Sequence, residues 1–148
     1  AFLCSRGLKT LELRVQAQSA TARRLAEWLA SHPRVSRVLY PGLPGHPGHA
    51  IAARQMAGGF GTIVSFELAG SAAEARRLVE STHLFQLAVS LGAVESLIEL
   101  PAVMSHGSYD PEARRAVGIA DGLVRLAVGL EAYEDLRDDL ASALDAAS

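Results

Sequence analysis

The chain has 148 residues, 49% of them hydrophobic and 20% charged, which is typical of a globular protein with a buried core. Its 14 basic and 16 acidic residues give a formal net charge of -2, which argues against a nucleic-acid partner, since such proteins carry a clustered basic excess. No apolar run approaches the ~18 residues of a membrane span, and the N-terminus lacks the layout of a signal peptide. We therefore expect a cytoplasmic protein without a membrane partner.

Cysteine and histidine usage argues against disulfide and metal chemistry. Cys4 is the single cysteine, so an intramolecular disulfide is excluded. We expect its thiol to be buried or half-buried rather than a nucleophile, because no histidine lies near it in the sequence. His46 and His49 flank a Pro-Gly turn, a poor geometry for two ligands of one ion, and no metal site is expected.

The stretch from Ala1 to about His32 has no proline and carries an apolar stripe with helical periodicity. The stripe consists of Leu8, Leu11, Val15, Ala22, Leu25 and Leu29. It predicts one long helix, in which Gly7 could mark a kink. This helix begins without a capping residue, which suggests that the chain once continued upstream.

Strands and helices alternate along the rest of the chain. The pattern predicts strands at 35–40, 62–68, 84–89, 96–100 and 123–128. It predicts helices at 49–56, 72–81, a short stretch after Asp110, and 133–146. Ser71 is a good cap for the second of these helices, and Asp110-Pro111-Glu112 reads as the start of the third. The order α-β-α-β-α-β-β-α-β-α indicates an α+β fold, a small sheet covered by helices.

Arg125 is the one charged residue of the expected strand Leu123 to Val128. A guanidinium on a largely buried strand needs an anionic partner, because an unpaired buried charge is very costly. One interpretation is an internal salt bridge to Glu95 or Glu99. The other is a ligand carboxylate, which the planar fork of arginine binds through two hydrogen bonds. The strand alone favours the salt bridge.

The segment Val89-Ser90-Leu91-Gly92 ends a strand with a small hydroxyl residue and a glycine corner. Such a corner can leave backbone N–H groups and a hydroxyl facing a ligand. A simple turn at the end of a strand explains the same residues and is favoured by the segment alone.

Read together, several stretches resemble the C-terminal half of the Cys/Met metabolism family of enzymes that depend on pyridoxal 5′-phosphate (PLP). They occur in the order of the family and span nearly the whole chain. The stretches are Arg-Gly-Leu-Lys-Thr-Leu at 6–11, Tyr-Pro-Gly-Leu at 40–43, Ser-Leu-Gly-Ala-Val-Glu-Ser-Leu-Ile at 90–98, Pro-Ala-Val-Met-Ser-His at 101–106, and Gly-Ile at 118–119 leading into Gly-Leu-Val-Arg-Leu-Ala-Val-Gly-Leu-Glu at 122–131.

The resemblance assigns roles to five residues. It implies that Arg125 grips the α-carboxylate of an amino-acid substrate and that Ser90 and Leu91 line the same pocket. It implies that Val89 faces the distal end of the substrate, where relatives that handle cystathionine usually carry glutamate; valine there resembles methionine γ-lyase. Ser105 stands where threonine is common and is expected to support the pocket.

The resemblance also implies a division of the chain and a cofactor held elsewhere. Residues 1–34 would be a long helix linking to a preceding PLP-binding domain, and 35–148 the C-terminal substrate-binding domain of the fold-type I fold, with a mainly antiparallel sheet. Lys9, the only lysine, does not match the Schiff-base segment, so no cofactor-binding or catalytic residue is expected here.

The expected whole enzyme is a homotetramer that performs γ-elimination or γ-replacement on a sulfur amino acid or O-acylhomoserine, and this chain alone is expected to be inactive. The competing interpretation is a stand-alone, non-catalytic module that binds an amino acid or a partner protein.

Overall fold

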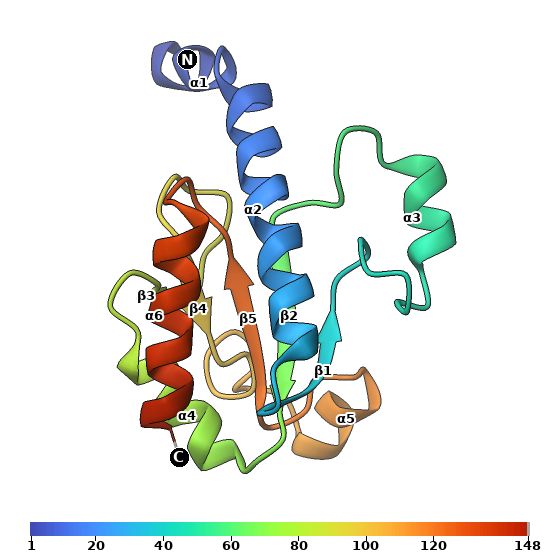
Figure 1. The fold of residues 1–148 in the computed structure, drawn as a ribbon, viewed down its shortest axis with the longest axis vertical. Helices are drawn as coiled ribbons and strands as arrows, with labels where there is room; N and C mark the ends of the chain where they lie inside the picture. The colour runs from blue at the N-terminus through green and yellow to red at the C-terminus, as the bar shows by residue number, and fades with distance from the viewer. Residues whose placement is uncertain (148) are drawn as a thin grey trace.

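The computed structural model describes residues 1–147 as helices packed on one sheet (Figure 1). Ser148, the last residue of the expected second domain, lies outside the described residues. The helices are α1 Phe2–Leu8, α2 Leu11–Ser31, α3 His49–Gln55, α4 Ala72–Ser81, α5 Pro111–Ala116 and α6 Tyr133–Ala146. The strands are β1 Val35–Leu39, β2 Ile63–Leu68, β3 Gln86–Leu87, β4 Leu97–Glu99 and β5 Leu123–Ala127. The expected order of elements is confirmed, except that the first helix is split in two.

The strands form one sheet in the order β1-β2-β5-β4-β3. All neighbours run antiparallel except β3 and β4, which are parallel. The expectation of a small, mainly antiparallel sheet is therefore confirmed. β5 lies at the centre, with β2 on one side and β4 on the other, so Arg125 is paired directly with Ser65 and with Glu99.

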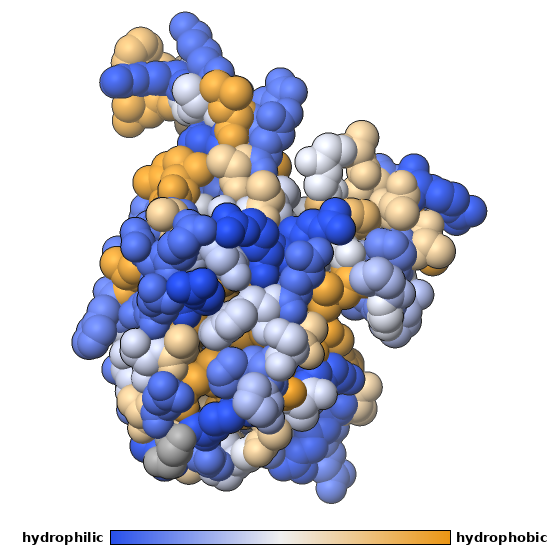
Figure 2. Space-filling model, in the orientation of Figure 1, coloured by the Kyte–Doolittle hydropathy of each residue, from blue (hydrophilic) through white to orange (hydrophobic). Residues whose placement is uncertain are grey.

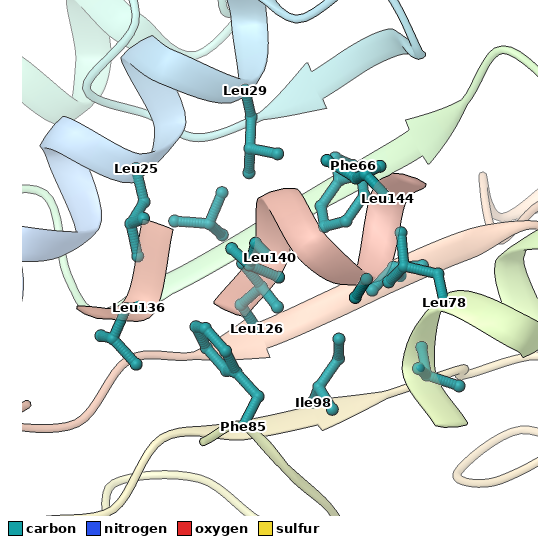
Figure 3. Packing of buried hydrophobic residues seen from close by; sticks show 14 of the residues in the cluster. Leu25, Leu29, Phe66, Leu78, Phe85, Ile98, Leu126, Leu136, Leu140 and Leu144 are labelled. Carbon is teal, nitrogen blue, oxygen red and sulfur yellow. The ribbon is translucent and has the colours of Figure 1, made fainter. Parts of the chain in front are cut away.

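The hydrophobic core lies on one face of the sheet, under α2, α4 and α6 (Figure 1). Figure 3 shows leucines of α2 and α6 meeting Phe66 of β2 and Leu126 of β5. Because successive side chains of a strand point to opposite faces, Val124 and Leu126 enter this core. Arg125 lies on the opposite face, which we call the second face of the sheet.

The expected helix from residue 1 to 32 is interrupted at Lys9 and Thr10, two residues beyond the expected weak point at Gly7. Arg14 of α2 explains how the break is stabilised. Its Nη2 donates to the Gly7 carbonyl oxygen at 2.9 Å and its Nε to the Thr10 hydroxyl at 3.2 Å. The guanidinium thereby adds to the bond that the Gly7 carbonyl oxygen accepts from the N–H of Thr10 at 3.4 Å, and it links α2 to the end of α1.

The strand expected at 84–89 shortens to β3 because Asp139 of α6 takes its first backbone donors. The carboxylate accepts hydrogen bonds from the N–H groups of His83, Leu84 and Phe85 at 2.7, 2.9 and 3.1 Å. These groups are therefore unavailable to a ladder. The strand expected at 96–100 likewise begins one residue late, since the N–H of Ser96 donates to Glu131 at 2.7 Å.

Apolar side chains are exposed on α1, which projects beyond the sheet at the end of α2 (Figures 1 and 2). Phe2 and Leu3 are 76% and 77% exposed, and α1 buries none of its residues. Cys4 shares this exposure, so the expectation of a buried or half-buried thiol is wrong: the helix that carries it has nothing packed around it in this chain. None of the helices among residues 1–147 is long and apolar enough to cross a membrane.

Candidate functional site

Arg125 lies in the middle of the second face of the sheet, on its central strand. Its neighbours on the same strand and face, Leu123 and Ala127, are buried, whereas the Arg125 side chain is 21% exposed. Ser65 of β2 and Glu99 of β4 flank it on the adjoining strands. The guanidinium is thus a partly accessible charge with apolar neighbours along its own strand and polar neighbours on the adjoining strands.

The contacts of the guanidinium include the salt bridge that was one interpretation of the sequence. Its Nη1 lies 2.8 Å from Oε1 of Glu99, so the salt bridge forms with Glu99 rather than with Glu95. Its Nη2 donates to the backbone carbonyl oxygen of Ser90 at 2.9 Å. Its Nε is buried and has no hydrogen-bond partner among the described residues. The ion pair therefore occupies only part of the fork and leaves donors toward Ser90.

Ser90 belongs to a loop, residues 89–95, that connects the edge strand β3 to its neighbour β4. Gly92 adopts a φ of +78°, which glycine tolerates at no steric cost. The far end of the loop is tied to the end of β5, because the N–H of Leu130 donates to the Val94 carbonyl oxygen at 2.8 Å. The glycine corner expected from the sequence is confirmed.

Val89 and Leu91 flank Ser90 with side chains that are 54% and 58% exposed. They share the loop with Ser90, whose carbonyl oxygen accepts a hydrogen bond from Arg125. Exposed apolar side chains on both sides of a polar anchor are suited to form walls once a ligand or a further protein surface covers them.

Ser105 reaches the same cluster from the turn that follows Pro101. Its hydroxyl lies 3.1 Å from Oε1 of Glu99, to which it donates, and 2.9 Å from Nδ1 of His106. Arg114 of α5 holds this segment in place by donating to the Ala102 carbonyl oxygen at 2.7 Å and pairing with Asp121. Ser105 therefore touches Arg125 only through Glu99.

The structure thus brings together three of the five residues singled out from the sequence: Arg125, Ser90 and Ser105. Glu99, considered there only as a possible salt-bridge partner, is the residue that joins them. Gln18 of α2 was not recognised at all. It is 2% exposed, and its Nε2 donates to the Ala93 and Val128 carbonyl oxygens at 2.7 and 3.0 Å, which holds the 89–95 loop against β5.

A signal for Gln18 was present in the sequence. The apolar stripe of α2 jumps from Val15 to Ala22, and position 18 lies between them at helical spacing, on the buried side. A polar side chain on a buried stripe needs hydrogen-bond partners, so this position indicates a buried polar contact.

The one lysine of the sequence belongs to neither the sheet nor the 89–95 loop. Lys9, its only lysine, is exposed at the C-terminal cap of α1, a helix that projects away from the sheet carrying Arg125 (Figure 1). Among residues 1–147, no group of three or more His, Cys, Asp or Glu side chains could hold a metal ion.

Comparisons with known proteins agree with this arrangement. The family model of the Cys/Met metabolism PLP-dependent enzymes matches residues 1–145. The cystathionine beta-lyase of Coxiella burnetii is 51% identical over 144 residues, which is 97% of this chain and 37% of that protein. The L-methionine gamma-lyase of Fusobacterium nucleatum is 48% identical over 145 residues, 98% of this chain and 36% of that protein.

The fold agrees as well. The crystal structure of cystathionine gamma synthase from Xanthomonas oryzae in complex with cystathionine superposes with a TM-score of 0.91 at 50% identity, covering 96% of this chain and 36% of that one. The chain spans a little over a third of the relatives it matches, and its α+β fold is the one found in that part of them. With the family model matching nearly its whole length, the chain belongs to the Cys/Met metabolism family of PLP-dependent enzymes.

Proposed function

We propose that this chain is the substrate-binding part of a longer PLP-dependent enzyme that performs γ-elimination or γ-replacement on a sulfur amino acid or an O-acylhomoserine. Family membership over residues 1–145 supports the enzyme over a stand-alone binding module. The matched relatives are named as cystathionine lyases, a cystathionine synthase and a methionine lyase, which supports a sulfur amino acid as the substrate. Their greater length supports a further domain outside this chain.

The observation that carries the proposal is the partly satisfied guanidinium of Arg125. One end of its fork pairs with Glu99, while Nε has no partner and Nη2 faces the Ser90 carbonyl oxygen. An α-carboxylate is the group that such remaining donors recognise best, because charge-assisted hydrogen bonds from a planar fork are strong and directional. We assign Arg125 the binding of the substrate α-carboxylate.

The geometry of the ion pair restricts how the carboxylate approaches. Because Nε is buried and Nη1 and Nη2 each have one partner, the available edge is the one formed by their remaining N–H groups. This edge adjoins the 89–95 loop through the bond to Ser90. Ser90 and Leu91 would therefore line the carboxylate end of the pocket, with Ser105 supporting it through Glu99.

Val89 would face the distal end of the substrate as an uncharged wall. Its side chain is exposed beside Ser90, in a position to be covered by a ligand. PLP, when bound to the whole enzyme, supplies the electron sink for breaking the bond to the leaving group. The residues of this chain bind and orient the amino acid, and the exposed Val89 and Leu91 exclude water once they are covered.

The cofactor would be held by a domain outside this chain. Lys9 is exposed and away from Arg125, which supports a Schiff-base lysine elsewhere. The apolar side chains of α1 and early α2 support a contact with that domain or with a second subunit of a homo-oligomer. These side chains are Phe2, Leu3, Leu8, Leu11, Leu13 and Val15.

Kinetics of Arg125→Lys in the full-length protein test the role of Arg125. Lysine keeps a positive charge for Glu99 but loses the fork, and one charge-assisted hydrogen bond is worth about 1.5–3 kcal/mol. We expect kcat/KM to fall about ten- to a hundredfold. Arg37→Lys is the control, because Arg37 on β1 pairs with Glu67 in a similar way. Unchanged kinetics of Arg125→Lys would favour a purely structural salt bridge.

The cofactor assignment has a separate spectroscopic test. Mixed with PLP, this chain of 148 residues should form no visible absorption band that borohydride abolishes. A band that appears with the chain and disappears in Lys9→Ala would place the cofactor lysine here and contradict the assignment.

A further inference from the structure

Glu99 is the most deeply buried charged residue near Arg125. Its side chain is 1% exposed on β4, and it is the direct cross-strand partner of Arg125. One of its oxygens, Oε1, accepts hydrogen bonds from Arg125 at 2.8 Å and from the Ser105 hydroxyl at 3.1 Å. The other, Oε2, is buried without a hydrogen-bond partner among the described residues.

Stability alone does not account for such a carboxylate. Buried ion pairs can often be replaced by apolar residues of similar volume with no loss of stability, because removing two charges from water is costly. An unsatisfied buried oxygen adds to that cost. Groups retained at such a cost are concentrated at functional sites.

The two contacts of the guanidinium determine its plane. Nη1 is held by Glu99 on β4, and Nη2 by the Ser90 carbonyl oxygen on the 89–95 loop. These anchors come from two separate segments on either side of the side chain. A long side chain held at both ends of its fork has lost its rotamer freedom before any ligand binds, so the donors that remain are already oriented.

We infer that Glu99 is a positioning residue, which holds the Arg125 guanidinium so that its remaining N–H groups face the substrate carboxylate beside Ser90. This inference rests on the proposed role of Arg125. Glu99 itself touches no substrate, and Ser105 orients Glu99 through the bond to Oε1.

Positioning has a kinetic signature that simple charge balance lacks. Glu99 and the substrate carboxylate are both negative, so removing Glu99 weakens a repulsion and should leave KM unchanged or lower it. Removing it also frees the guanidinium to rotate. Because small misplacements of a bound substrate can cost about a hundredfold in rate, the loss should fall on kcat.

The test uses two variants in the full-length protein. Glu99→Leu removes the acceptor, and we expect kcat to fall about ten- to a hundredfold with KM equal or lower. Glu99→Gln keeps a carbonyl acceptor at the same reach but loses the charge, and we expect a smaller fall in kcat, of about threefold to tenfold. Glu67→Gln is the matched control, since Glu67 of β2 lies on the same face and pairs with Arg37. Its kinetics should not change.

A double variant separates the two proposals. If Glu99 acts through Arg125, Glu99→Leu should have little further effect in an Arg125→Lys background. Additive losses would overturn the inference, as would a raised KM with unchanged kcat in both Glu99 variants. If Arg125→Lys alone has no effect, the proposed role of Arg125 fails. If it has its effect while both Glu99 variants behave as wild type, only the positioning role fails. If Glu99→Leu does not fold, Glu99→Gln alone decides. A kcat of Glu99→Gln equal to that of Glu67→Gln would then overturn the positioning role of Glu99.

Discussion

Glu99 and Arg125 are direct partners across β4 and β5, with Oε1 and Nη1 2.8 Å apart, and their side chains are 1% and 21% exposed. The acid is thus enclosed in protein while the base remains partly accessible. This asymmetry means that the two residues respond differently to substitution, because a charge stranded in the interior costs far more than one that can reach water.

Arg125→Ala should therefore destabilise the chain strongly, by about 3–5 kcal/mol, because it leaves the Glu99 carboxylate buried and unpaired. The double variant Glu99→Leu/Arg125→Met should lie within about 1–2 kcal/mol of the original, since it removes both charges and keeps their volume. Urea unfolding followed by circular dichroism compares them. A single variant as stable as the double one would contradict the buried-pair argument. Because Arg125→Ala is expected to lose stability, a loss of activity in this variant does not by itself demonstrate a loss of substrate binding.

Gln18→Leu should loosen the loop that carries Ser90. The substitution removes both hydrogen bonds that the side-chain amide donates to the Ala93 and Val128 carbonyl oxygens, at a cost of about 1–3 kcal/mol. Amide hydrogen exchange across residues 89–95 should accelerate more than exchange in α6. Gln16→Leu is the control, because Gln16 is exposed and bonds only to Glu12 of the same helix. Equal exchange in the two variants would exclude a role for Gln18 in holding the loop.

The start of α4 should make stability depend on pH. Hydrogen bonds from the backbone N–H of Ser71 and then from its hydroxyl, with the Arg34 guanidinium nearby, hold the pKa of Glu74 below its ordinary value of 4.5. Because the folded-state pKa is lowered, this contribution is present above the unfolded value and is lost as pH falls through the folded one.

Glu74→Gln should accordingly lose less stability than the original chain when the pH falls from about 6 to about 3. Ser71→Ala keeps the backbone donor but loses the hydroxyl, so its pH dependence should lie between the two. Thermal unfolding midpoints across that range measure the effect. If the three curves fell in parallel, Glu74 would have no such role.

Local sequence patterns correctly predicted the elements whose bounds depend only on residues close together in the sequence. The Ser71 and Asp110 caps form as expected, and α6 follows the predicted bounds. The errors arise from contacts between distant residues. Asp139 shortens β3 from more than 50 positions away, and the bonds of Gln18 span separations of 75 and 110 residues.

In the candidate site, too, a local pattern identified the residue, whereas its contacts with distant residues could not be predicted. A lone charge in an apolar strand identified Arg125, and its two interpretations could be stated but not combined. The structure shows the salt bridge, in which Glu99 pairs with one end of the fork while the other end donates to Ser90. The distinction between Glu95 and Glu99 required the β4–β5 register, which periodicity does not specify.

The full-length enzyme should prefer substrates with an uncharged distal end, because Val89 offers no carboxylate to a distal ammonium. The names of the matched relatives do not separate the candidates, since a cystathionine beta-lyase and an L-methionine gamma-lyase are 51% and 48% identical to this chain. A salt link to a distal ammonium is worth about 1.5–3 kcal/mol, so its absence should cost cystathionine roughly ten- to a hundredfold in kcat/KM.

Val89→Glu should restore that factor for cystathionine and leave methionine equal or worse. Val94→Glu is the matched control: it adds the same charge to the same loop at a side chain of similar exposure, 52% against 54%. Steady-state kcat/KM for cystathionine, methionine and homocysteine is measured in all three proteins. A highest value for cystathionine in the unaltered enzyme would contradict the prediction. An equal gain from Val94→Glu would assign the effect to the net charge of the loop. Only a carboxylate beside Ser90 is placed to meet the distal ammonium of a substrate whose other end is held by Arg125.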